Sequence, residues 1–114
     1  MLTSNQILDL LKAQLGSDYR TGKELNIPQP RVSRIRNSGG ILNDEQGVKA
    51  AQILGLKEEF ILLSLAAERA QNSPVYSILK KIADKFEPKS AAAAFLFSVF
   101  IVASFALPSL PITA

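Results

Sequence analysis

The side chains best suited to chemistry are cations and polar groups clustered between positions 20 and 37. The cations are Arg20, Lys23, Arg31, Arg34 and Arg36. Only Glu24 offsets them, and three polar side chains lie nearby, Gln29, Ser33 and Asn37. A local excess of positive charge favours a polyanion, and phosphate is the commonest such partner of a small domain. This cluster is therefore more informative than the overall net charge of +3.

Other kinds of chemistry are excluded by composition. The 114 residues include no Cys and no His, so disulfides, Cys/His metal sites, Cys nucleophiles and Ser-His-Asp triads are all excluded. No Asp/Glu cluster has the spacing of a metal-binding loop, and there is no phosphate-binding glycine loop. We therefore expect no enzyme activity, no metal and no cofactor. The first residues carry Asp9 and no basic segment, so they do not form a secretory signal.

The spacing of apolar residues predicts an all-α fold of five to six helices. No stretch alternates apolar and polar residues with the two-residue period of a strand. Two capping boxes, Thr3 with Gln6 and Asn43 with Gln46, open helices, and Ser73 with Pro74 gives another start signal. The expected helices cover residues 3–15, 18–25, 28–37, 43–54, 57–71 and 74–86.

The second and third of these helices are separated by a tight turn. Asn26 is expected at its sharpest point, because Asn accepts a left-handed backbone. Pro28 and Pro30 are tolerated only around the first turn of a helix, so they mark where the third helix starts. Val32 and Ile35 should then face inward, and the opposite face should be polar and basic.

From Gly22 onward, the pattern small-x-x-Leu-Asn-Ile-x-x-x-x-Val-Ser-x-Ile resembles a helix-turn-helix of the phage-repressor (Cro/repressor-like) type. Domains of this family occur in small filamentous-phage regulatory proteins. In the family a small residue lets the two helices approach closely, and Gly22 stands at that position. Asn26 replaces the usual Gly of the turn, and Pro28 replaces the usual Ser or Thr cap. The resemblance covers about Thr3 to Gln71.

The resemblance implies a sequence-specific transcriptional regulator that binds double-stranded DNA as a homodimer. On the outer face of the third helix, the residues expected to read bases are Gln29, Arg31, Ser33, Arg34 and Asn37. The residues expected to contact phosphates are Arg20, Lys23 and Arg36. The alternative is that all of these are ordinary solvated side chains of a small helical bundle.

The C-terminal tail has a different composition. Residues 90–114 carry no charged side chain, and 90–107 form an uninterrupted apolar and small-residue stretch. As a helix, these 18 residues would span about 27 Å, close to the thickness of a bilayer core. We predict a single transmembrane helix in the inner membrane, with the basic N-terminal side in the cytoplasm. The alternative is a cytoplasmic protein whose tail packs within the domain or a dimer.

These expectations divide the chain into three parts. Residues 1–72 form the DNA-binding domain, 73–89 an amphipathic connecting helix, and 90–114 the hydrophobic tail. The apolar residues of 57–86 form either a dimer surface or part of the monomer core. A second functional hypothesis is a small membrane protein whose helical head binds a protein partner, in phage assembly or at the envelope, without DNA activity.

Overall fold

Six α-helices build the part of the chain that the structure describes. The computed structural model describes residues 1–88. Its helices are α1 (Ser4–Leu15), α2 (Asp18–Leu25), α3 (Gln29–Ser38), α4 (Asp44–Leu54), α5 (Glu58–Arg69) and α6 (Tyr76–Lys85). Residues 1–88 contain no strand, so the all-α prediction is confirmed for this part.

Local capping explains where most of these helices begin and end. The Gln6 amide donates to Thr3 Oγ1 at 3.2 Å, and the Thr3 amide donates back to Gln6 Oε1 at 2.9 Å. Asn43 and Gln46 form the same reciprocal pair at the start of α4. Gly16, which ends α1, has a left-handed backbone (φ 106°) that other L-residues adopt only with strain. The predicted boundaries of α1 and α4 are therefore confirmed to within a residue.

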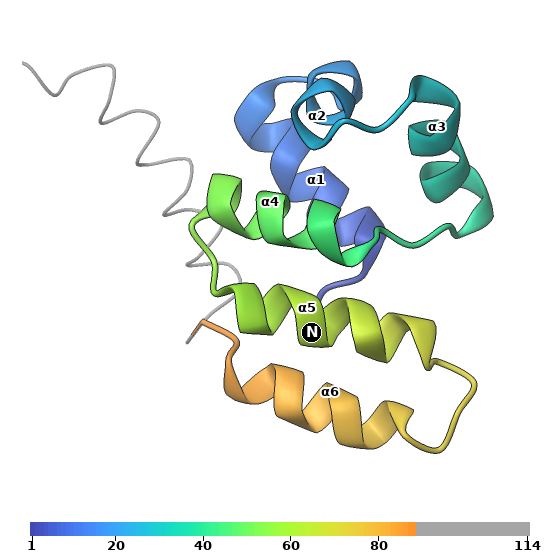
Figure 1. Ribbon diagram of the computed structural model, residues 1–114, viewed down its shortest axis with the longest axis vertical. Coiled ribbons are helices and arrows are strands. Elements are labelled where there is room, and N and C mark those ends of the chain that lie inside the picture. Colours follow the sequence, from blue (N-terminus) through green and yellow to red (C-terminus); the bar gives the residue numbers. More distant parts are fainter. Residues whose placement is uncertain (89–114) are drawn as a thin grey trace, which may run out of the picture.

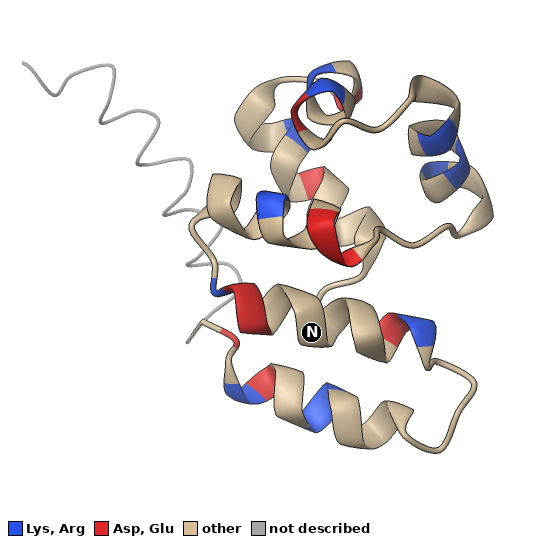
Figure 2. Ribbon diagram, viewed as in Figure 1, with Lys and Arg blue, Asp and Glu red and all other residues tan. Residues whose placement is uncertain are grey.

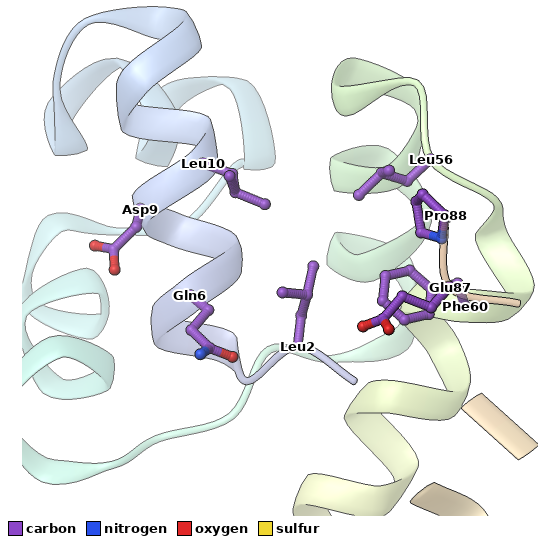
Figure 3. A pocket seen from close by; sticks show the side chains of 8 residues that line it. All are labelled: Leu2, Gln6, Asp9, Leu10, Leu56, Phe60, Glu87 and Pro88. Carbon is purple, nitrogen blue, oxygen red and sulfur yellow. The ribbon is translucent and has the colours of Figure 1, made fainter. Parts of the chain in front are cut away.

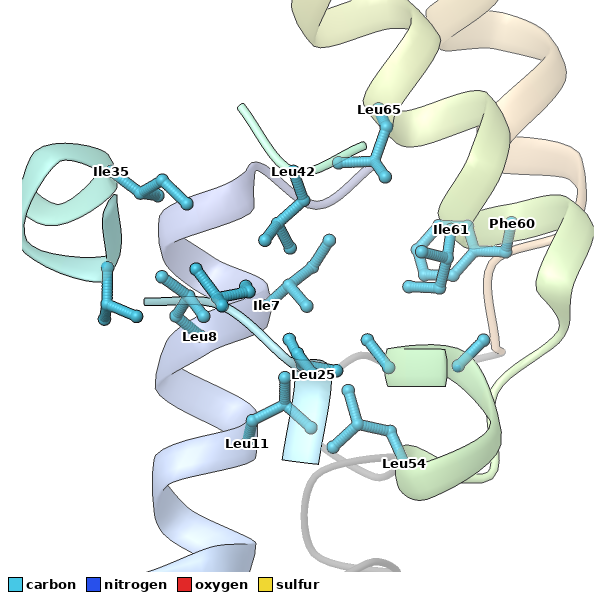
Figure 4. Packing of buried hydrophobic residues seen from close by; sticks show 14 residues of the cluster. Ile7, Leu8, Leu11, Leu25, Ile35, Leu42, Leu54, Phe60, Ile61 and Leu65 are labelled. Carbon is cyan, nitrogen blue, oxygen red and sulfur yellow. The ribbon is translucent and has the colours of Figure 1, made fainter. Parts of the chain in front are cut away.

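The helices pack around one core in which α1 is central. Helix α1 contacts α2, α3 and α4, while α5 lies between α4 and α6 (Figure 1). The core is built from side chains of α1 to α5 and the loop before α4, and ten of its members are labelled in Figure 4: Ile7, Leu8, Leu11, Leu25, Ile35, Leu42, Leu54, Phe60, Ile61 and Leu65. This body holds α2 and α3 at one end of the molecule.

A buried polar contact joins three segments of this core. The Ser4 hydroxyl donates to Glu68 of α5 at 2.8 Å and accepts from the Leu42 amide at 3.0 Å. The Ser4 amide also donates to Glu68, at 2.9 Å. Ser4 is fully buried, so its hydroxyl has no access to water as a replacement partner.

Helix α6 begins later than the sequence predicts. It begins at Tyr76 rather than Pro74, because Ser73 O accepts from the Tyr76 amide at 3.0 Å and closes a turn first. The first i to i+4 bond then runs from the Leu79 amide to Val75 O. Helix α6 packs along α5. The N-terminal ammonium also binds the end of α6, through Asp84 at 2.7 Å and Glu87 at 3.1 Å.

The apolar residues of 57–86 mostly pack within the monomer. Phe60 is 1% exposed and lies in the core, and α5 is covered by α4 on one side and α6 on the other. Two large apolar side chains of the Val75–Lys85 segment remain exposed, Val75 and Ile78. The alternative of core closure therefore describes Phe60, whereas Val75 and Ile78 are the large apolar side chains of this region that remain available for a contact between monomers.

No helix within residues 1–88 is both long and apolar enough to cross a membrane. The predicted transmembrane helix at 90–107 lies outside the described residues, so that prediction stays a prediction.

Candidate nucleic-acid interface

The turn between α2 and α3 is built around Asn26. This residue has a left-handed backbone (φ 57°, ψ 48°), and among residues 1–88 no other non-glycine residue has a positive φ. The Ile27 amide then donates to Gly22 O at 2.7 Å, which folds the chain back against α2. Helix α3 follows at once, with the Arg31 and Val32 amides both donating to Pro28 O. The predicted place and chemistry of the turn are confirmed.

Gly22 allows α2 and α3 to approach closely. A Cβ atom at this position would lie 3.0 Å from Ile27 O and 3.2 Å from Val32 Cγ2. The first of these atoms belongs to the backbone, which cannot move aside as a flexible side chain can. The hydrogen bond of the turn and the contact with α3 therefore both use the space that a side chain at Gly22 would fill.

Helix α3 has one buried face and one free face. Val32 and Ile35 are 1% and 2% exposed, as predicted, and hold the helix on the core. The opposite face is exposed and carries Gln29, Ser33, Arg34 and Asn37. None of these four side chains forms a hydrogen bond or ion pair with another residue of 1–88. They are therefore available to an external ligand, and α3 carries no carboxylate that would repel an anion (Figure 2).

Arg36 was expected to contact phosphate, but the structure places it inside an ion-pair cluster. Its guanidinium donates to both Asp18 oxygens, at 2.9 and 3.2 Å, and to Asp9 at 2.5 Å. It also donates to the Asn5 side chain at 2.7 Å. The side chain is 18% exposed. We therefore remove Arg36 from the residues expected to contact phosphate, because its charge is neutralised by carboxylates of α1 and α2.

This cluster also shifts the pKa values of Asp18 and Arg36. The hydrogen bond from Arg36 lowers the pKa of Asp18 below its usual value, with burial opposing the effect. The same hydrogen bond raises the pKa of Arg36. The ion pair that joins α2 and α3 therefore stays charged to lower pH than an isolated Asp would allow.

The Arg31 side chain is also hydrogen-bonded within the domain, so it is not free to read bases. Its side chain is half-buried, and its terminal Nη2 donates to Ile41 O at 3.2 Å, in the loop after α3. The buried Nε has no hydrogen-bond partner among the described residues. Arg31 lies at the edge of the α3 face, as predicted, but its hydrogen bond to Ile41 holds the loop between α3 and α4 against this edge.

Helix α2 supplies a second group of free cations. Arg20 and Lys23 are both exposed and form no ion pair with a described residue. Lys23 Nζ lies 5.1 Å from the ring centroid of Tyr19, at a distance typical of a cation–π contact. Tyr19 is 57% exposed and was not among the predicted residues, although an aromatic residue beside two cations was a usable signal. Glu24 is the acidic residue that offsets this group.

A metal site is the other kind of polar site that the acidic residues could form. No group of three or more Asp or Glu side chains within residues 1–88 is arranged to bind a metal ion. Comparison with protein-family models, with curated proteins and with solved structures gives no match to this chain. The exposed polar and basic side chains of α2 and α3 are the features of the described residues that agree with the expected DNA-binding surface.

Proposed function

We propose that this chain is a sequence-specific DNA-binding transcriptional regulator of the phage or bacterial kind, tethered to the inner membrane by residues 90–107. The observation that carries the proposal is the free outer face of α3. That face presents Gln29, Ser33, Arg34 and Asn37 side by side, without a partner among residues 1–88 and without a carboxylate on the helix. A helix with this surface fits the major groove, whose base edges offer donors and acceptors.

The side chains of this face have distinct expected roles. Arg34 suits a guanine edge through two parallel hydrogen bonds, whereas Gln29 and Asn37 suit adenine. Ser33 is short and can donate to or accept from either kind of base. Arg20 and Lys23 on α2 are better placed for phosphates, which fix the register of the domain without reading sequence.

The position of the chain end supports a membrane tether. Residues 86–88 end the described chain on the side of the molecule away from α3, as the orange end of the ribbon and the α3 label show in Figure 1. A tail that leaves from this side lets the domain sit at a membrane while α3 points toward the cytoplasm.

Regulators with this kind of helix pair bind as two-fold dimers with half-sites about one helical turn apart. The exposed Val75 and Ile78 on the outer side of α6 are the apolar residues best placed for a contact between monomers. The same two residues favour the second candidate function, a helical head that binds a protein partner.

The decisive experiment selects binding sites from random duplex DNA with a chain ending at Lys89, followed by gel-shift titration of the selected site. We expect Arg34→Ala to weaken binding by about 5- to 150-fold, corresponding to roughly 1–3 kcal/mol for a base contact. The matched control is Lys81→Ala, which removes one charge from an exposed and unpaired position on α6. It should leave affinity within about twofold, since non-contacting surface changes are nearly neutral.

A second arm tests the phosphate assignment. Lys23→Ala should weaken binding to all sequences similarly and reduce the slope of log affinity against log salt by about one. If no enriched sequence emerges, and no binding occurs even at low salt, the DNA proposal is wrong and the protein-partner function takes its place. Fractionation of cells that express the intact chain or the chain ending at Lys89 tests the tether. With membranes present, an intact chain recovered only in the soluble fraction would rule out the anchor.

A further inference from the structure

An apolar pocket lies at the point where the described chain ends. Its walls are Leu2 and Leu10 around α1, Leu56 in the turn before α5, and Phe60 of α5 (Figure 3). Gln6 and Asp9 lie on one side of it, and Glu87 and Pro88 on the other (Figure 3). The last described residue, Pro88, is therefore itself part of the pocket wall.

The pocket is separate from the candidate DNA-binding surface. None of the residues that line it belongs to α2 or α3. Leu2, Leu10 and Leu56 are only partly buried, although each packs against the core. The pocket thus leaves apolar surface uncovered by the described residues, and that surface favours an apolar occupant.

We propose that this pocket binds the chain's own apolar tail, through Phe95 or Phe97, whenever the tail is not in a bilayer. The sequence supports this occupant over others. After Lys89 no charged residue follows, and the first large apolar side chain beyond Pro88 is Phe95. The six residues 89–94 can span at most about 20 Å, which keeps Phe95 within reach of the pocket that Pro88 lines.

The size of the pocket fits an aromatic ring. Its volume is about 240 Å³, whereas a cavity of about 150 Å³ lined by apolar side chains is enough to bind benzene. Covalent attachment also gives the tail a local concentration of about millimolar, which a separate peptide or a second copy would have to exceed. The nearest apolar segment of the same chain therefore has the advantage over other occupants.

This docking gives the tail two alternative locations, the pocket and the bilayer. The pocket accepts one or two side chains, whereas a bilayer can take the whole stretch 90–107, so the bilayer should win when lipid is present. The proposal does not depend on DNA binding. The docked tail and the proposed membrane anchor are the same residues. The pocket can bind them even if 90–107 never enters a membrane.

The absence of Cys from the chain allows a direct test by disulfide trapping. The full chain carrying Leu56→Cys and Ser98→Cys is synthesised in a cell-free system without membranes, oxidised with copper phenanthroline, and run on a non-reducing gel. Both phenylalanines stay in place. A second version uses Leu10→Cys in place of Leu56→Cys, in case one substitution disturbs folding. The control carries Ser33→Cys, on the exposed face of α3, with Ser98→Cys.

We expect an intramolecular disulfide in at least one pocket variant, at a yield about fivefold or more above the control, because docking raises the local concentration of the tail at that site. Phe95→Ser with Phe97→Ser should reduce the yield to the control level, and phospholipid vesicles present during synthesis should do the same. Equal yields in the pocket and control variants, disulfides only between molecules, or no disulfide from either pocket variant would each overturn the docking. A yield unchanged by vesicles would overturn the exchange with a bilayer.

Discussion

Arg34 and Arg36 lie two residues apart on helix α3, but their surroundings differ. Arg36 is bound by Asp18, Asp9 and Asn5, whereas Arg34 is exposed and has no partner among residues 1–88. The same substitution at each position should therefore affect different properties. Arg36→Ala should reduce stability, and Arg34→Ala should reduce DNA binding while leaving stability nearly unchanged.

The expected cost of Arg36→Ala follows from the exposure of its partners. The side chains of Arg36 and Asp18 are 18% and 29% exposed, and they share two hydrogen bonds, so this pair should contribute about 1.5 kcal/mol. Asp9 is 67% exposed, so its pair should add only about 0.5 kcal/mol. The total is about 2 kcal/mol, or roughly 10 °C in Tm for a domain of this size.

Urea denaturation of chains ending at Lys89, followed by circular dichroism, measures this difference. Arg34→Ala is the matched control, because it makes the same change on the same helix and should stay within about 0.5 kcal/mol of the parent. If the two variants have equal stability, the ion-pair cluster does not hold α1, α2 and α3 together, and the removal of Arg36 from the phosphate-contacting set is wrong.

The remaining predictions concern pH and two buried positions. Because Arg36 lowers the folded-state pKa of Asp18, their pair contributes stability above the unfolded pKa, about 3.9, and loses it as pH falls through the lower folded value. The difference in unfolding free energy between the parent and Arg36→Ala should thus be complete at pH 6 and should begin to shrink as the pH falls below about 4. A difference independent of pH would contradict this. Gly22→Ala should destabilise by about 1 kcal/mol in urea, because contact with Ile27 O outweighs the gain in helix propensity; a stabilised variant would show that the two helices have room to separate. Ser4→Ala should cost about 1–3 kcal/mol by the same measurement, because Leu42 N–H and Glu68 lose a buried partner, whereas Ser33→Ala on the exposed face should be nearly neutral.

Much of the helix layout could be predicted because its signals are local. The capping boxes at Thr3 and Asn43 act over three residues, and the left-handed positions at Gly16 and Asn26 depend on the residue itself. The start of α6 was missed for a related reason. Ser73 and Pro74 are compatible with either a cap or a preceding turn, and the turn closed by Tyr76 is the one that forms.

The sequence by itself determined that a basic helix with an inward face of Val32 and Ile35 follows a tight turn, because periodicity decides which residues share a face. Only the tertiary structure decided which of its cations are free. Arg34 and Arg36 look alike in the sequence, but the partners that bind Arg36 lie 18 to 31 residues away on α1 and α2. The apolar pocket likewise joins Leu2 to Pro88, from opposite ends of the described chain. Contacts between residues so far apart in the sequence depend on how the helices pack. The spacing of residues along one helix cannot predict them.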